Sequence, residues 1–324
     1  MKYRDELYRT PEILNKVVGA KPEKILVDAP FVAFCGCGTS FYISGQLARL
    51  CTVQGKNAVA VEAVDLIESS LLTENKCTVF VFISRSGNSM ETVIAMRKVK
   101  KEGFATFYLG CTEGSVLDKE CDESKVIGFA NETLVIESFS YSAQMMCLAL
   151  CCNLKVSDES ISIKIKKALD LSRDVFRQNL KQTEIQRMIC LGSPFYMPLL
   201  KEMMLKNGEI TQKSSEVWGI LEFRHGPRSW ADDKCLITVL PGIQTYDYDI
   251  KVAKELVSYG SNVIWFGKDP VKGALNIKLD ATQYSVDEVL IIAAFLTGLA
   301  GEIGESCSVD AANLKHVVHA VGEL

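Results

Sequence analysis

The feature that most constrains the fold is a repeated pattern, in which a short apolar run ends in glycine and a helical pattern follows. Residues 31–36 form such a run and lead into a helical pattern over 43–50. Residues 188–192 repeat the run and lead into a predicted helix over 196–207. Each half adds a second apolar strand and a long apolar helix, at 77–84 and 139–152 and again at 235–240 and 286–301. Continuous apolar strands alternating with helices are typical of a parallel sheet covered on both faces. The sequence therefore predicts an α/β chain with two doubly wound parallel-sheet domains in tandem.

The length of the chain agrees with two such domains. It has 324 residues, and domains commonly hold about 150 residues each. Residues 157–182 are charged and helical in period, which favours a connecting helix. We therefore predict a first domain with N-terminal helices over 1–155. The second domain, over 156–324, contains the connecting helix and a C-terminal tail.

Charge and composition exclude several classes of function. The net charge of −4 provides no basic surface for nucleic acid and no polybasic membrane patch. The longest apolar runs, 145–152 and 289–300, are too short to span a bilayer. Several of the 12 cysteines lie in apolar runs, and the first ten residues are polar and charged, so a reducing cytoplasm is expected. With three histidines and no paired cysteine spacing, a metal site is not expected.

Two turns carry residues suited to binding a phosphate. In doubly wound sheets, ligands bind beyond the carboxyl ends of the strands, which directs attention to the segments after Gly36 and Ile83. Residues 84–89 hold three serines and Gly87 directly before a predicted helix. Helix N-termini offer N–H groups to anions, and glycine permits close backbone approach. The alternative is that these serines are ordinary helix caps. Neither turn matches a dinucleotide or Walker motif.

Charged residues also repeat along the second-domain helix. Glu202, Lys206, Glu209 and Lys213 are spaced so that they lie on one helix face. A carboxylate with a tuned pKa suits proton transfer at carbon. The alternative is an exposed face with surface ion pairs. His225 precedes Gly-Pro in a predicted turn, where it is either structural or a neutral-pH acid–base group.

Four segments together resemble a known family. Cys37–Ser40 and Ile83–Ser89 resemble the phosphate-binding turns of the sugar isomerase (SIS) domain family. Lys206–Ile210 and Leu221–Pro227 resemble segments of its catalytic double-domain members. The resemblance extends over nearly the whole chain. It is similar to the isomerase domain of glucosamine-6-phosphate synthase and more so to the tagatose-6-phosphate ketose/aldose isomerase branch. No counterpart of the synthase's glutamine-hydrolysing domain is seen, so ammonia delivery from glutamine is not expected.

The resemblance implies roles for individual residues. Glu209 would relay a proton between C1 and C2, Lys206 would be a supporting cation, and His225 would open the sugar ring. In this family the histidine can come from a neighbouring subunit, which implies a homo-oligomer, dimer or tetramer, with the site near a subunit interface. Arg85 stands where the synthase has glutamine and could favour another epimer. The implied substrate- and phosphate-binding residues are Thr39, Ser40, Ser84, Arg85, Ser86, Ser89 and Ser138, with Lys315 or His316 from the C-terminal tail.

The implied activity is isomerisation of an aldose or amino sugar 6-phosphate to a ketose 6-phosphate through an enediol-type intermediate, with no cofactor or metal. Two alternatives stay open. One is a deaminase or a fructosamine-6-phosphate deglycase on the same scaffold. The other is a non-catalytic sugar-phosphate sensor, although no DNA-binding helical domain is recognised and Glu209 is present.

Overall fold

The computed structural model describes residues 3–23, 26, 28–69, 77–156, 160–279, 283–311 and 314. Contacts divide the chain into two compact units, which are described separately. The first unit holds residues up to 166 and residues 285–290, and the second holds residues 167–284 and 291–311. Lys315 and His316 lie outside the described residues.

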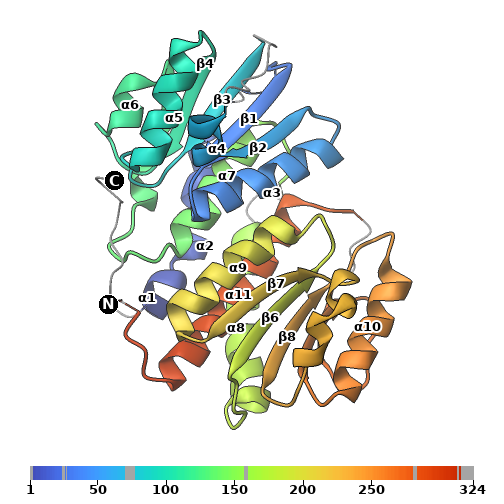
Figure 1. The fold of residues 1–324 in the computed structure, drawn as a ribbon. Coiled ribbons are helices and arrows are strands. Elements are labelled where there is room, and N and C mark those ends of the chain that lie inside the picture. The colour runs from blue at the N-terminus through green and yellow to red at the C-terminus, as the bar shows by residue number, and fades with distance from the viewer. Residues whose placement is uncertain are drawn as a thin grey trace. The chain divides into compact units, whose positions relative to one another are not determined.

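The first unit is built on a five-stranded parallel sheet (Figure 1). Cys35 of β1 pairs with Phe82 of β3, so these two central strands end at the same level. The spatial order is β2 (Ala58–Glu62), β1 (Phe31–Gly36), β3 (Thr78–Ile83), β4 (Ala105–Gly110) and β5 (Glu123–Val126).

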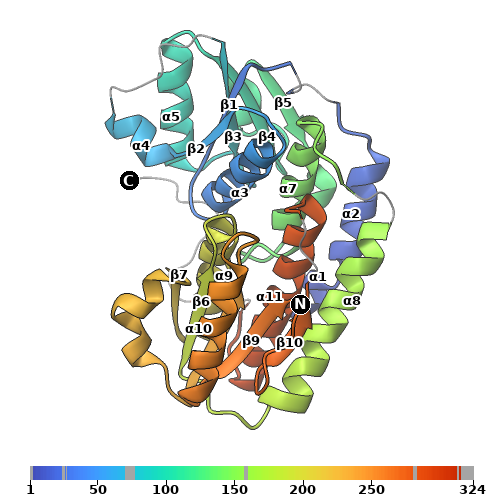
Figure 2. The same cartoon turned by 90° about the vertical axis from the view of Figure 1, so that its right-hand side faces the viewer.

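Helices cover both faces of this first sheet. Figure 2 shows α4 and α5 on one side of the sheet and α3 and α7 on the other. Buried side chains of β1, β3 and β4 form one core with α4, α5 and α6. The helices of this unit are α1 (Tyr3–Leu7), α2 (Thr10–Gly19), α3 (Thr39–Val53), α4 (Ala63–Glu68), α5 (Met90–Lys101), α6 (Val116–Glu120) and α7 (Phe139–Cys151), with a 3₁₀ turn at Gly128–Ala130.

The second unit repeats this topology. Its sheet has the order β10 (Leu275–Lys278), β9 (Asn262–Gly267), β8 (Cys235–Leu240), β6 (Arg187–Gly192) and β7 (Ser214–Gly219). Renumbered within each unit and read from the same side, both sheets have the order 2-1-3-4-5, the doubly wound order of flavodoxin-like folds. The predicted tandem of doubly wound parallel sheets is confirmed.

Helices surround the second sheet as well. Side chains of α10 (Tyr246–Ser258) share one core with β6, β8 and β9. α9 (Met197–Thr211) packs on β6 and β7. Two glycines of α11 (Val286–Ser306) allow close packing, because a Cβ at Gly298 or Gly304 would meet Ser172 of α8 or Ile210 of α9. The remaining elements are α8 (Ser160–Val175), a π-helical turn at Phe176–Leu180, and the 3₁₀ turns η3 (Glu222–His225) and η4 (Pro227–Trp230).

Within the part of the chain that the structure describes, none of the helices has both the length and the apolar character that a membrane span requires.

Candidate active site

The topology of the first unit places two turns beside each other at the point where its strand order reverses. In doubly wound sheets this switch point is where ligands bind. One turn follows β1 and opens α3, and the other follows β3 and opens α5. The Cys37 thiol lies 3.3 Å from the Thr92 hydroxyl, so a polar contact joins the first turn to the start of α5.

The turn after β1 brings the start of α3 against the end of the strand. A Cβ on Gly36 would lie 2.7 Å from the Cβ of Ser40, so only glycine fits at this position. Gly38, the N-cap residue of α3, has a φ of +52°, in the left-handed region that favours glycine. Thr39 and Ser40 are both buried in the first turn of the helix. Since the N-cap is a glycine, serine capping does not explain this turn.

The turn after β3 is braced by its own serines. The Ser84 hydroxyl accepts a hydrogen bond of 3.1 Å from the N–H of Gly87 and lies 3.5 Å from the Ser89 hydroxyl. The Ser86 hydroxyl accepts from the N–H of Asn88 at 3.2 Å. Ser89 is the N-cap residue of α5, yet its side chain makes no capping hydrogen bond. The first turn of α5 therefore lacks the serine cap that the alternative interpretation required.

Gly87 is required for packing in this turn. Its φ is +65°, and a Cβ there would lie 2.1 Å from the Ser115 hydroxyl and 2.6 Å from the Tyr108 hydroxyl. The N–H of Leu117 donates to its carbonyl at 3.1 Å. Ser115 and Tyr108 therefore fill the side of Gly87 on which a Cβ would stand, and the expected approach of a phosphate to its backbone stays a prediction.

Arg85 is directed at the loop before α7. Its guanidinium donates to the carbonyls of Leu134 and Val135, each at 3.0 Å, and lies 3.9 Å from the carboxylate of Glu137. The side chain is only 7% exposed. These contacts make Arg85 a brace between the serine turn and the 134–137 loop. Its expected contact with a sugar stays a prediction.

A buried carboxylate that the sequence analysis missed holds Ser138 in place. Glu132 accepts hydrogen bonds from the N–H groups of Ser138 and Ser140 and from the Ser138 hydroxyl. Burial raises the pKa of Glu132 to about 7, although these hydrogen bonds oppose the shift. The start of α7 is therefore capped by a carboxylate six residues upstream. No local capping motif has that spacing, so the sequence carried no signal for it.

In the second unit, the charged residues of α9 form a largely buried cluster. The ammonium of Lys206 lies 3.4 Å from the carboxylate of Glu202 and 3.1 Å from that of Glu209. The side chains of Glu202 and Lys206 are 1% and 3% exposed, whereas that of Glu209 is 21% exposed. The alternative of an exposed helix face is therefore wrong for this cluster. The arrangement leaves a cation-held carboxylate that reaches the surface of its unit.

Two details of the predicted helix need correction. α9 ends at Thr211, so Lys213 is not on its face. The helix also continues through Gly208, beyond the predicted end at residue 207. A Cβ on Gly208 would meet nothing within 4 Å.

His225 ends the 3₁₀ turn η3 and is exposed. The buried Phe223 anchors this turn in the core of the second unit. Arg224 contacts Glu255 of α10 at 3.3 Å. Among the described residues, no hydrogen bond or ion pair joins His225 to Lys206 or Glu209. The ring is therefore presented outward from its unit.

Among the residues that the structure describes, no group of three or more histidine, cysteine, aspartate or glutamate side chains is placed to hold a metal ion.

Comparisons with known proteins agree with this architecture. Residues 25–153 match the model of the SIS domain. The chain is 24% identical over 248 residues to the isomerizing glutamine–fructose-6-phosphate aminotransferase of Campylobacter jejuni, which covers 72% of this chain and 41% of that protein. The corresponding protein of Francisella tularensis is 22% identical over 312 residues, covering 84% and 50%. The chain thus spans half or less of the length of these curated relatives.

Solved structures share the fold over almost the full chain. The C-terminal domain of glucosamine-fructose-6-phosphate aminotransferase from Francisella tularensis gives a TM-score of 0.82 at 20% identity, covering 94% of this chain and 96% of that one. Glucosamine-6-phosphate deaminase from Thermotoga maritima gives 0.79 at 21%, covering 98% and 96%. Tagatose-6-phosphate ketose/aldose isomerase from Escherichia coli gives 0.78 at 19%, covering 96% and 95%. Residues 25–153 therefore resemble the SIS domain, and the two-sheet fold is shared with these solved structures over nearly the whole length of the chain.

Proposed function

We propose that this chain is a phosphosugar isomerase that interconverts an aldose or amino sugar 6-phosphate and a ketose 6-phosphate through an enediol-type intermediate. The observation that carries the proposal is the cluster on α9, in which a buried ammonium holds one oxygen of Glu209 at 3.1 Å. A partly exposed carboxylate fixed in this way can accept a proton from carbon and return it to the neighbouring carbon. The sugar phosphates named for the solved and curated relatives support a sugar phosphate as the substrate class.

The proposed phosphate site is the pair of turns in the first unit. α3 and α5 both begin at these turns, and helix N-termini favour anions through their N–H groups and dipole. Ser40, Ser84, Ser86 and Ser89 supply hydroxyl donors there, with Thr39 in the same first turn of α3 as Ser40. No lysine is needed, because oriented amides and hydroxyls neutralise the anion locally.

The proposed reaction has two stages. His225 moves a proton between the ring oxygen and the anomeric hydroxyl, which opens the ring. Glu209 then removes the proton from C2 of the open aldose and delivers it to C1, while the carbonyl passes from C1 to C2. Lys206 positions Glu209. His225 is exposed and is therefore available to a second copy of the chain. We propose a homo-oligomer, dimer or tetramer, in which His225 completes a neighbouring site.

The test is proton exchange with solvent. Fructose, tagatose, glucosamine and galactosamine 6-phosphates are incubated with the protein in D₂O, and NMR follows deuterium at C1 and C2 together with the product. We expect exchange and isomerisation with at least one sugar, and loss of both in Glu209→Gln. The exposed carboxylate variant Glu184→Gln is the matched control and should keep the activity. Binding without any exchange by the unaltered protein would refute the isomerase.

The same assay, extended to a fructosamine 6-phosphate that carries an amino acid, separates the alternatives. Ammonia released from an amino sugar phosphate indicates a deaminase, and amino acid released from a fructosamine 6-phosphate indicates a deglycase. A ligand that raises the melting temperature without turnover indicates a sensor.

A further inference from the structure

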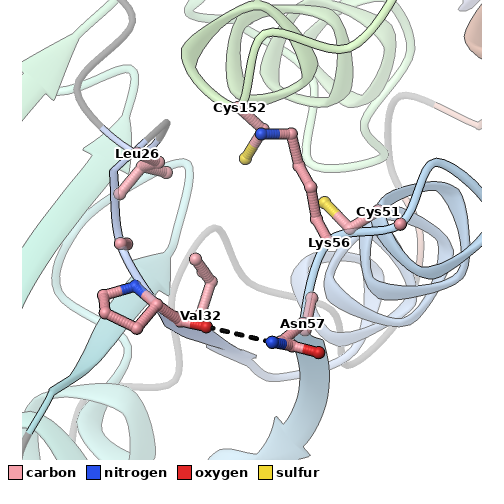
Figure 3. Close-up of a pocket in the computed structure, with 10 residues that line it drawn as sticks. Leu26, Val32, Cys51, Lys56, Asn57 and Cys152 are labelled. Atoms are coloured by element: carbon pink, nitrogen blue, oxygen red, sulfur yellow. Dashed lines mark hydrogen bonds between the residues drawn. The ribbon is translucent and has the colours of Figure 1, made fainter.

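The first unit contains a cavity. It has a volume of about 260 Å³, and the labelled residues of Figure 3 line it: Leu26, Val32, Cys51, Lys56, Asn57 and Cys152. Val32 and Asn57 lie at the amino-terminal ends of β1 and β2, whereas the serine turns follow the carboxyl ends of β1 and β3. The cavity is therefore separate from the proposed phosphate site.

Two thiols line this cavity. Cys51 belongs to the last turn of α3, and Cys152 directly follows α7. Each residue is 1% exposed, and both are free thiols. The sulfur of Cys51 is hydrogen-bonded to the thiol of Cys152, which lowers the pKa of Cys51 despite burial, and the nearby Lys56 ammonium lowers it further. Cys51 is therefore the more easily ionised of the two thiols that line this cavity.

We propose that Cys51 and Cys152 form a thiol oxidation site, at which a small hydroperoxide that enters the cavity converts the pair into a disulfide. One water molecule occupies about 30 Å³ of liquid volume, so the cavity has room for hydrogen peroxide beside the sulfurs. A disulfide bond is about 2.05 Å long, so the side chains of Cys51 and Cys152 must approach each other within the cavity that both of them line. The proposal is independent of the isomerase function.

The chemistry balances in two steps. The thiolate of Cys51 attacks one peroxide oxygen, the O–O bond breaks, and the leaving oxygen departs as water after taking up a proton. Cys51 is then a sulfenic acid. The sulfur of Cys152 attacks the Cys51 sulfur, the S–O bond breaks, and hydroxide leaves as water with the proton of the Cys152 thiol. The two thiols lose two electrons in total, and the peroxide gains them.

The link would connect two helices at their far ends. α3 begins at Thr39 and α7 begins beside Ser138, and both residues belong to the predicted substrate set. Both helices end at the cysteine pair. A disulfide there fixes the C-terminal ends of α3 and α7 to each other and closes a long loop of chain, which stabilises the folded state by restricting the unfolded one. We therefore expect the oxidised protein to melt at a higher temperature than the reduced protein.

Neighbouring thiols provide the competing products. Cys147 and Cys151 lie one turn apart on α7 and share a hydrogen bond of their own. Cys77 and Cys307 are exposed. If the thiols of this chain were oxidised without any influence of the cavity, these four thiols would be expected to react.

The experiment is peptide mapping of the full chain. The reduced protein is treated with hydrogen peroxide, remaining thiols are alkylated, and the digest is analysed by mass spectrometry with fragmentation to locate each link. We expect a Cys51–Cys152 disulfide that dithiothreitol reverses and that forms equally in the control Cys77→Ser/Cys307→Ser. Replacing Lys56 with methionine should slow its formation several-fold, because the thiolate loses its cation.

Three results would overturn the proposal. They are oxidation confined to Cys77 and Cys307, a Cys147–Cys151 link in place of the expected one, and overoxidation of Cys51 while Cys152 remains a thiol. The mapping uses the unaltered chain, so its outcome does not depend on whether cysteine variants fold.

Discussion

Glu132 places an ionisable group in the interior of the first unit, where its charge should cost stability. Its carboxylate accepts hydrogen bonds from the backbone and hydroxyl of Ser138 and from the backbone of Ser140, at the start of α7. A glutamine at this position has the same shape. Its carbonyl can accept from the two N–H groups, and its amide can donate to the Ser138 hydroxyl, which also accepts. Glu132→Gln therefore removes the charge and keeps the cap.

The sign and size of the effect follow from the raised pKa. Burial raises the pKa of Glu132 from 4.5 to about 7, so the folded state binds the proton more tightly than the unfolded state. Its contribution to stability is complete below the unfolded pKa and is lost as the pH rises through the folded pKa. At 1.36 kcal/mol per pKa unit, the loss is roughly 1 kcal/mol at pH 5 and roughly 3 kcal/mol at pH 8. Glu132→Gln does not lose this stability, because glutamine does not ionise.

The assay is thermal unfolding of both proteins between pH 5 and pH 8. The melting-temperature advantage of Glu132→Gln should widen by about 4–8 °C over this range, since a domain of this size gains about 2–4 °C per kcal/mol. Glu184→Gln, an exposed carboxylate, should show a difference that does not vary with pH. A constant gap for Glu132→Gln as well would refute the reasoning, because the three donors would then compensate fully for burial.

Two further predictions concern packing. Gly87→Ala should destabilise the first unit by about 2 kcal/mol or more, because the new Cβ would enter the space of Ser115 and Tyr108 at a positive φ. Denaturant unfolding measures this loss of stability, and an unchanged unfolding midpoint would contradict the prediction. Lys206→Met should cost about 3–5 kcal/mol, because it removes the ammonium that Glu202 and Glu209 contact. Adding Glu202→Gln should restore part of that loss, and an additive double variant would show that the two residues are not coupled.

The sequence predicted the central strands well and the outer strands poorly. β1, β3, β6 and β8 are buried on both faces, so they appear as continuous apolar runs. β5 and β10 are four residues long, lie at the sheet edges and are partly exposed, so no periodic pattern marks them. Their places follow from the repeated topology, not from local sequence.

The site was predictable where it depends on chain neighbours and not where it depends on distant contacts. The turns after Gly36 and Ile83 follow from strand ends that feed helices. Arg85, in contrast, donates to carbonyls 49 and 50 residues away, and no spacing rule reaches that far. Glu132 was missed because its ligands are backbone N–H groups, which every residue carries. The packing of Gly87 against Ser115 and Tyr108 was also missed, because these side chains come from β4 and from the start of α6, far along the chain.

Charge spacing on α9 illustrates what such patterns leave open. A spacing of three and four residues predicts ion pairs on one helix face, but it does not predict whether that face meets water. In the structure, Glu202 and Lys206 are buried, and only Glu209 reaches the surface of its unit. Buried ion pairs are costly to desolvate, and apolar residues of similar volume are often at least as stable in their place. Stability alone therefore does not explain why these charges are buried. The proposed proton transfer does explain it, because it needs a carboxylate held in one position.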